Sequence, residues 1–414
     1  MHAIEKILAN NAGLDKVEIG QIVTCNIDFA EINDLYLQTI YSFWEMGGKK
    51  VFDKNKVAFV FDHYSPAPTI KTAQIHKEMR EFVKDQGLTH HFDINKGICH
   101  QVMPESGLIY PGMIIVATDS HTTTHGAFGA FGTGVGATDM ATILISGKLW
   151  FRVPEIINIE INGIPSKNTY AKDVILYIVG KVKANGAVYK AIEFSGDYVE
   201  KIDVSERMTI CNMAVEMGAK TAYMAPNKAV IDYVNSRATK DYTIYEIDEG
   251  YEYSEHLVFN IDGLEPQLAV PHSVDNNVSV KDGVGTKIHQ AFIGSCTGGR
   301  FEDIETAWKI LKGKKIHPDV RLVIIPASDE IQLSIIEKRY MRDLIKAGVT
   351  FSAPGCGPCL GTHAGIIADD EVCITSTNRN FPGRMGSNKA SIYLASPATV
   401  AASALNGYIT EPIV

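Results

Sequence analysis

This chain of 414 residues lacks the features that mark membrane, secreted and nucleic-acid-binding proteins. No apolar run approaches the roughly 20 residues that a membrane-spanning helix needs. The N-terminal stretch mixes charges of both signs and lacks the apolar segment and small-residue cleavage site of a secretory signal. The net charge is −9, so the basic character of nucleic-acid-binding proteins is absent as well. We therefore expect a soluble, cytoplasmic protein that binds neither membranes nor nucleic acid.

The cysteine content argues against a disulfide framework. There are seven cysteines, an odd number in a long chain, which favours a reducing compartment with free or metal-bound thiols. Four are predicted to be simple buried thiols: Cys25, Cys99, Cys211 and Cys373.

What the chain does contain is a repeated alternation of Val-, Ile- and Phe-rich runs with helix-like stretches, which predicts an α/β fold with largely parallel sheets. The length exceeds a single core and predicts several domains. A Pro154–Glu155 turn and the polar segment VDNNVSVKDGVG suggest boundaries that give domains 1–153, 154–283 and 284–414.

Five predicted strands end at reactive side chains. Strand 56–61 ends at Asp62 and His63, 113–117 at Asp119, Ser120 and His121, 289–294 at Cys296, 349–353 at Cys356 and Cys359, and 372–375 at Asn378 and Arg379. In open α/β sheets, ligands bind outside the carboxyl ends of the strands. The pattern therefore predicts one shared cleft.

Cys296, in GSCTGGR, and the pair Cys356 and Cys359, in PGCGPCLG, offer three soft ligands where an iron–sulfur cube normally takes four. An iron without a protein ligand would accept substrate oxygen and act as a Lewis acid. A zinc site completed by His363 and a thioredoxin-like redox pair stay open on spacing alone. The nearby Arg384 belongs to an arginine-containing segment that suits a carboxylate substrate.

Two further motifs place a carboxylate beside an imidazole, an arrangement that orients histidine for proton transfer. They are Asp62–His63 and Asp119–Ser120–His121. Ser120 lies in TDSHT, without the Gly-x-Ser-x-Gly turn of a serine-hydrolase nucleophile.

Other polar and glycine-rich motifs are weaker signals. Gly132 and Gly134 approach a dinucleotide fingerprint, but no strand is predicted directly before them, so close backbone packing is favoured. By itself, His100 is interpreted as a satisfied core histidine. Asn212 and Glu216, four residues apart, would be an exposed polar pair on one helix face.

Taken together, the motifs resemble the aconitase superfamily, in particular its large subunits of isopropylmalate dehydratase and homoaconitase type. The resemblance covers nearly the whole chain and includes GICHQVMPE (97–105), TDSHTTTHGAFGAFGTGVGATDMA (118–141), MTICNMAVEMGAK (208–220) and TSTNRNFPGRMGS (375–387), besides FDH (61–63) and the cysteine motifs. It implies an aconitase-like fold of three α/β/α domains around a central cluster cleft.

The resemblance also implies chemistry. Cys296, Cys356 and Cys359 would bind a [4Fe-4S] cluster whose fourth iron is open to substrate, and His363 would then be no ligand. The implied catalytic residues are Asp62, His63, His100, Asp119, His121 and Glu216. The implied substrate-binding residues are Ser120, Asn212, Asn378, Arg379 and Arg384. The implied reaction is dehydration and rehydration of a 2-hydroxy dicarboxylate or tricarboxylate. The first choice is the conversion of 2-isopropylmalate to 3-isopropylmalate in leucine biosynthesis.

The swivelling fourth domain of single-chain aconitases has no counterpart in the chain, so a separate small subunit is the implied partner. Asn33, Tyr36 and Gly298 depart from the family's usual pattern. They keep homoaconitate, 2,3-dimethylmalate and a citramalate-type acid as alternative substrates. A cluster-regulated RNA-binding protein is a remote alternative that the acidic composition opposes.

Overall fold

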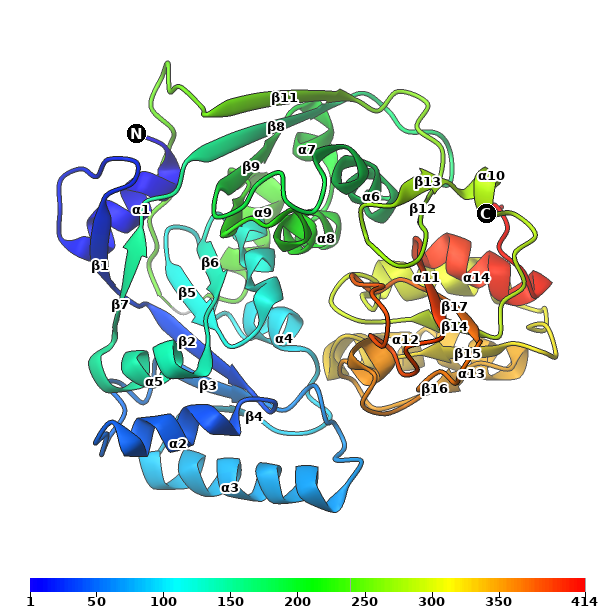
Figure 1. Ribbon diagram of the computed structural model, residues 1–414, viewed down its shortest axis with the longest axis horizontal. Coiled ribbons are helices and arrows are strands. Elements are labelled where there is room, and N and C mark those ends of the chain that lie inside the picture. Colours follow the sequence, from blue (N-terminus) through cyan, green and yellow to red (C-terminus); the bar gives the residue numbers. More distant parts are fainter. Residues whose placement is uncertain (239, 414) are drawn as a thin grey trace.

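The computed structural model describes residues 1–238 and 240–413 and confirms the α/β fold. Three main sheets succeed one another along the chain and are arranged around a common centre (Figure 1). Within the described residues, no helix has both the length and the apolar character that crossing a bilayer requires.

The first sheet is fully parallel, in the order β4-β3-β2-β5-β6. Its strands are β2 (Phe29–Asn33), β3 (Val57–Val60), β4 (His90–Phe92), β5 (Ile114–Ala117) and β6 (Phe131–Gly134). β2, β3 and β5 are buried along their whole length, as expected for a parallel sheet covered on both faces. The accompanying helices are α1 (Ala3–Ala12), α2 (Leu37–Glu45), α3 (Ile70–Gln86), α4 (Cys99–Glu105) and α5 (Ala137–Ser146).

A two-stranded antiparallel ribbon follows, formed by β1 (Ile22–Asn26) and β7 (Lys148–Arg152). The structure ends α5 at Ser146, with Gly147 in the left-handed conformation, and β7 begins immediately afterwards. Burial alternates along both strands, so one face of the ribbon packs inward and the other is exposed.

The second sheet is parallel, in the order β10-β9-β8-β11. Its strands are β8 (Ile156–Asn162), β9 (Ala191–Ser195), β10 (Thr221–Tyr223) and β11 (Glu255–Asn260), and its helices are α6 (Ala171–Val182), α7 (Asp197–Lys201), α8 (Val204–Asn212) and α9 (Lys228–Asn235). Helices α6 to α9 lie on the inner side of this sheet, towards the centre of the molecule (Figure 1).

The third sheet has seven strands in the order β13-β12-β18-β17-β14-β15-β16. They are β12 (Gln267–Ala269), β13 (Asn277–Ser279), β14 (Gln290–Ile293), β15 (Arg321–Ile324), β16 (Thr350–Phe351), β17 (Val372–Thr375) and β18 (Ser391–Leu394). The helices of this region are α10 (Val280–Gly283), α11 (Phe301–Leu311), α12 (Asp329–Glu337), α13 (Tyr340–Ala347) and α14 (Pro397–Asn406).

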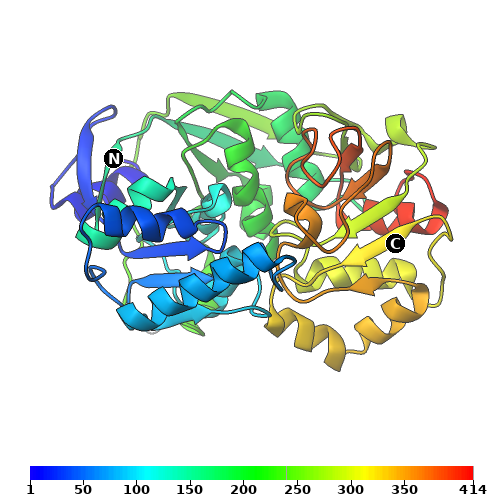
Figure 2. The same ribbon diagram turned by 60° about the horizontal axis from the view of Figure 1, so that its bottom comes forward.

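Strands β12 and β13 connect the second and third regions. β12 pairs antiparallel with β18, so residues 267–279 hydrogen bond to the third sheet although the sequence grouped them with the second region. Both boundaries stay predictions, and the one at 153 falls between β7 and β8. Figure 2 shows the first and third regions side by side, so that loops of the two regions can contact each other.

Candidate metal and acid–base site

The loops at the carboxyl ends of β3, β5, β14, β16 and β17 converge on one small cavity. Its lining contains all three cysteines of the predicted cluster site, five of the predicted catalytic residues and two of the predicted substrate-binding residues. They are Asp62, His63, His100, Asp119 and His121, with Asn378 and Arg384. Residues from the first and third sheets thus share a single site, as the positions of the motifs had indicated.

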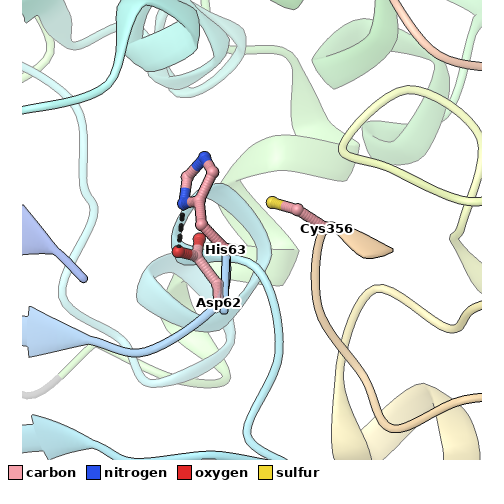
Figure 3. Close-up of side chains that lie close together, drawn as sticks. All are labelled: Asp62, His63 and Cys356. Atoms are coloured by element: carbon pink, nitrogen blue, oxygen red, sulfur yellow. Dashed lines mark hydrogen bonds and ion pairs between the residues drawn. The ribbon is translucent and has the colours of Figure 1, made fainter. Parts of the chain in front are cut away.

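His63 and Asp62 form the first pair of this site. His63 Nδ1 lies 2.6 Å from Asp62 Oδ1, and Cys356 points towards the same two side chains (Figure 3). Asp62 is fixed further by the backbone N–H of Cys99, which donates to Asp62 Oδ2 at 2.9 Å. Burial lowers the pKa of His63, but the carboxylate of Asp62 and the Cys356 sulfur outweigh it and raise the pKa well above its usual value.

Asp119 is the centre of the acid–base network. Its Oδ1 lies 2.9 Å from His100 Nε2 and accepts from the backbone N–H of His121 at 2.7 Å, while Oδ2 lies 3.5 Å from His63 Nε2. Burial raises the pKa of Asp119, yet hydrogen bonds from these histidines lower it well below its usual range. A carboxylate that stays ionised can hold several imidazoles in fixed orientations.

Glu216 continues the network on the side of the second sheet. Its Oε1 lies 2.8 Å from His121 Nε2 and accepts from Arg379 Nε at 2.8 Å. Asn212 ends α8, and Glu216 lies on the following 3₁₀ turn. Both side chains are buried, so the interpretation of an exposed polar pair was wrong. They face inward because the turn carries them towards the loops of the other two sheets.

Two of the three thiols, those of Cys296 and Cys359, receive hydrogen bonds that suit anionic sulfur. Asn212 and Asn378 donate to Cys296 Sγ at 3.1 and 3.4 Å, and Arg384 donates to Cys359 Sγ at 3.7 Å. All seven cysteines are free, so none of these sulfurs is consumed by a disulfide. Converging buried thiols with such donors fit an iron–sulfur cluster, whose sulfurs are tuned by hydrogen bonds.

A fourth thiol, that of Cys99, lines the same cavity. Burial and then the charge of Glu31 raise the pKa of Cys99 well above its usual value. Within residues 1–238 and 240–413, no amide or guanidinium donates to its sulfur, in contrast to Cys296 and Cys359. Cys99 is a buried free thiol, and its exclusion from the ligand set stays a prediction.

The geometry gives little support to a metal site that uses Asp62 and His63, or His363, as ligands. Asp62, His63 and Cys356 place one potential ligand atom each within 4.8 Å of one another. The close His63–Asp62 hydrogen bond, however, already occupies one atom of each of those two side chains. His363 does not line the cavity with the cysteines, and its buried Nε2 has no partner in the described part of the chain.

Two supporting side chains were not identified from the sequence. Lys172, on α6, is buried and donates to Thr297 Oγ1 at 3.1 Å and to the carbonyl oxygens of Ser376 and Thr377 at 3.0 and 2.7 Å. It thereby ties the loop of Cys296 to the loop of Asn378. A lysine in a helix carries no sequence signal for such a role.

The second supporting side chain is Asp34. It accepts from the backbone N–H groups of His63 and Tyr64 and lies 2.9 Å from His76 Nε2. Asp34 thus fixes the loop on which His63 stands. The neighbouring Glu31 is also buried, and neither of its carboxyl oxygens has a partner among the described residues.

Packing explains Gly298, one of the departures from the family pattern. A Cβ at this position would collide with Ser376, whose hydroxyl accepts from the backbone N–H of Gly294 at 3.1 Å. A residue with a side chain cannot fit at position 298 while this contact between the two loops exists.

Ser120 lies at the edge of the site. Its Oγ is 3.5 Å from His121 Nδ1, and the residue lines a second, larger cavity that shares Asp119 with the first. Tyr36 lines the second cavity as well, whereas Asn33 is fully buried and its backbone N–H donates to Thr118 Oγ1 at 3.0 Å.

The chain is similar to known proteins along nearly its whole length. A family model described as the aconitase family (aconitate hydratase) matches residues 48–286 and 281–407. A 3-isopropylmalate dehydratase large subunit from Methanopyrus kandleri is 48% identical over 409 residues, which cover 99% of this chain and 98% of the relative. A protein from Methanothermobacter thermautotrophicus named "Probable methanogen homoaconitase large subunit" is 48% identical over 417 residues, covering 100% and 97%.

A solved structure is also similar. The holo-form of Thermococcus kodakaraensis aconitase X matches with a TM-score of 0.50 at 14% identity, over 91% of this chain and 89% of that one. At this identity the likeness concerns the fold alone.

Proposed function

Because the chain belongs to the aconitase family, we propose that it is the large subunit of a two-subunit hydro-lyase that isomerises a 2-hydroxy acid by dehydration and rehydration. The first choice is 3-isopropylmalate dehydratase, acting in leucine biosynthesis. Homoaconitase is the principal alternative, since relatives of both names are equally similar. 2,3-Dimethylmalate and a citramalate-type acid remain further candidate substrates. The observation that carries the proposal is the convergence of three thiols and the Asp119–His100 pair on one buried cavity.

In this proposal Cys296, Cys356 and Cys359 hold a [4Fe-4S] cluster. When bound, such a cluster supplies a Lewis-acidic iron that lacks a protein ligand. Asn212 and Asn378 stabilise the sulfur of Cys296 by donating to it, and Arg384 does the same for Cys359.

The histidines and carboxylates move and hold protons. Hydroxide is a poor leaving group, so its departure requires protonation by a nearby acid. Asp119 orients His100 towards the cavity, and Glu216 orients His121. Asp62 keeps His63 charged by raising its pKa, which places a proton donor beside the same space. Glu216 is in turn fixed by Arg379.

The substrate carboxylate needs cationic donors, and Arg384 is suited to this role. Its Nε is buried without a hydrogen-bond partner among the described residues, while Nη2 is engaged by Cys359. A buried donor of this kind is costly unless a ligand satisfies it. Ser120, at the edge of the site, offers a hydroxyl to the same ligand.

Among the described residues, the carboxylates of the site are already hydrogen-bonded to histidines, so we assign removal of the carbon-bound proton to a small subunit. The relatives are named large subunits, which implies such a partner. Closure of the partner over the cavity would also exclude water from the reaction.

Co-expression with the small subunit, followed by anaerobic assay of a panel of 2-hydroxy acids and their alkenes, tests the proposal. We expect hydration of 2-isopropylmaleate to 3-isopropylmalate, and little turnover by the large subunit alone. A reconstituted complex that hydrates none of the acids would overturn the assignment.

A further inference from the structure

Arg300 ends the GSCTGGR motif of Cys296, and the chemistry assigned above does not use it. It directly precedes α11, and its side chain is buried although a guanidinium is always charged. Burying such a group costs free energy unless its N–H groups find acceptors. The three acceptors of Arg300 connect the site with each region of the fold.

Each nitrogen of the guanidinium donates to a different region. Nη2 donates to the carbonyl oxygen of Cys296 at 2.6 Å, in the third region. Nε donates to Gln101 Oε1 at 3.1 Å, in the first region, and Nη1 donates to Thr209 Oγ1 at 2.9 Å, in the second. These bonds are charge-assisted and therefore stronger than bonds between neutral groups. A single planar fork thus ties the three regions together.

The acceptors adjoin residues of the thiol and acid–base site. Gln101 follows His100 on α4. Thr209 lies three residues before Asn212 on α8, and Asn212 donates to Cys296 Sγ at 3.1 Å. Residues three apart on a helix share a face, so Thr209 and Asn212 both contact the loop of Cys296. The guanidinium therefore controls where α4 and α8 place the imidazole and the amide.

We propose that Arg300 is a positioning residue. It holds His100 and Asn212 at the distances from Cys296 that the reaction requires. Arg300 does not line the cavity of the thiols, so it acts through its three acceptors. The part of the inference that concerns turnover rests on the proposed function. The part that concerns the sulfur of Cys296 needs a bound cluster but no substrate, because Asn212 donates to that sulfur.

A conservative change at Arg300 tests the proposal in the assembled, anaerobically reconstituted enzyme. Arg300→Lys keeps the charge but lacks the planar fork, so it cannot donate to all three acceptors. We expect kcat to fall roughly ten- to a hundredfold, since small displacements of catalytic groups lower the rate strongly. KM and iron content should stay close to wild type, while the electron paramagnetic resonance spectrum of the reduced cluster should shift. Arg342→Lys, at an exposed position on α13, is the control and should match wild type in all four measurements.

Chemical rescue distinguishes positioning from a general loss of structure. Arg300→Ala removes the fork and leaves a buried space that free guanidinium ion can fill. Guanidinium at low millimolar concentration should raise the kcat of Arg300→Ala about tenfold, because hydrogen bonds from a charged donor return. Urea has a similar planar shape without the charge, and sodium chloride supplies the same ionic strength, so neither should restore kcat. Circular dichroism verifies that the variant is folded.

Two further variants leave Arg300 in place and divide its role. Thr209→Val removes the acceptor on α8, so it should shift the resonance spectrum of the cluster. Gln101→Met removes the acceptor beside His100, so it should lower kcat and leave that spectrum unchanged. Both replacements nearly keep the volume of the original side chain, so they also test the proposal if Arg300→Ala does not fold.

The outcomes separate this inference from the proposed function. If the complex turns over none of the acids but the resonance spectra change as expected, the proposed function is overturned and the positioning role is supported. Wild-type kcat and spectrum in Arg300→Lys, an unchanged spectrum in Thr209→Val, or equal rescue by urea and guanidinium overturn the positioning role.

Hydrogen exchange of the full chain alone covers the case in which no cluster is bound. Faster amide exchange in α4 and α8 of Arg300→Ala, reversed by guanidinium, supports the positioning role. Faster exchange confined to α11 overturns it, because the three regions would then be held together without the guanidinium.

Discussion

The ammonium of Lys172 lies 2.7 Å from the carbonyl oxygen of Thr377, one residue before Asn378. The same group donates to Thr297 and Ser376, so three acceptors from two cysteine-site loops share one buried cation. Burial lowers the pKa of Lys172 to about 8, while the sulfur of Cys296 is the largest influence that raises it. Lys172 therefore acts as a clamp and as a positive charge beside the thiols.

Lys172→Met should reduce the iron and sulfide retained per chain. The Ser376 carbonyl keeps the Thr297 hydroxyl as a donor, but the Thr377 carbonyl loses its lysine donor, which costs about 1–3 kcal/mol, and the positive charge is lost as well. Lys172→Arg keeps the charge but alters the donor geometry, so it should retain an intermediate amount. Lys181→Met, on the same helix, is the control. Wild-type iron and sulfide content in Lys172→Met would contradict the clamp.

Serine substitution of each cysteine should separate cluster ligands from bystanders. We expect Cys296→Ser, Cys356→Ser and Cys359→Ser to lose most of the visible absorption and bound iron after anaerobic reconstitution. Cys99 lines the same cavity, but Cys99→Ser should retain both, because acidic side chains surround its sulfur and, among the described residues, no amide or guanidinium donates to it. If Cys99→Ser were the only one of these four variants to lose its iron, the assignment of ligands and bystander would be wrong.

Much of the fold could be predicted from the sequence because buried parallel strands appear as continuous apolar runs. The runs at 56–61, 113–117, 289–294 and 372–375 became β3, β5, β14 and β17, and their reactive residues do meet. The pairing of β12 with β18 could not be predicted, since this contact is short and joins residues far apart in sequence.

The candidate site was predictable where residue type itself carries chemistry, as for Cys296 or Asp119. It was not predictable where the role comes from burial alone. Lys172 and Asp34 look like ordinary charged residues in the sequence, and only packing between regions makes Lys172 a clamp and Asp34 an anchor for the loop of His63.

Asp119→Asn should lower kcat by roughly 10²- to 10⁴-fold, the usual contribution of general acid–base catalysis. An amide is neutral and cannot accept from His63, His100 and the backbone of His121 as an ionised carboxylate does. The cluster absorption should persist, because Asp119 is not among the proposed ligands. Asp93→Asn, which removes a surface partner of Arg80, is the control. Unchanged kcat in Asp119→Asn would exclude Asp119 from the proton-transfer network.

A final prediction concerns Glu105, which connects the first and third regions by accepting from Gln101 at 2.7 Å and from Ser328 at 2.9 Å. Burial raises the pKa of Glu105 from 4.5 to about 7. Between these values the unfolded chain releases this proton while the folded chain keeps it. The contribution of Glu105 to the free energy of unfolding therefore falls as pH rises from 4.5 to 7 and is constant above.

The Glu105→Gln variant has no titratable group at this position. Its free energy of unfolding, relative to that of wild type, should therefore increase by on the order of 1–3 kcal/mol as pH rises across that window. Urea titrations at intervals from pH 5 to 8 measure the difference. Glu81→Gln, at an exposed position, should give a difference that does not change with pH. A pH-independent difference for Glu105→Gln would mean that the carboxyl is ionised at the junction of the two regions, and that Gln101 and Ser328 fully compensate its burial.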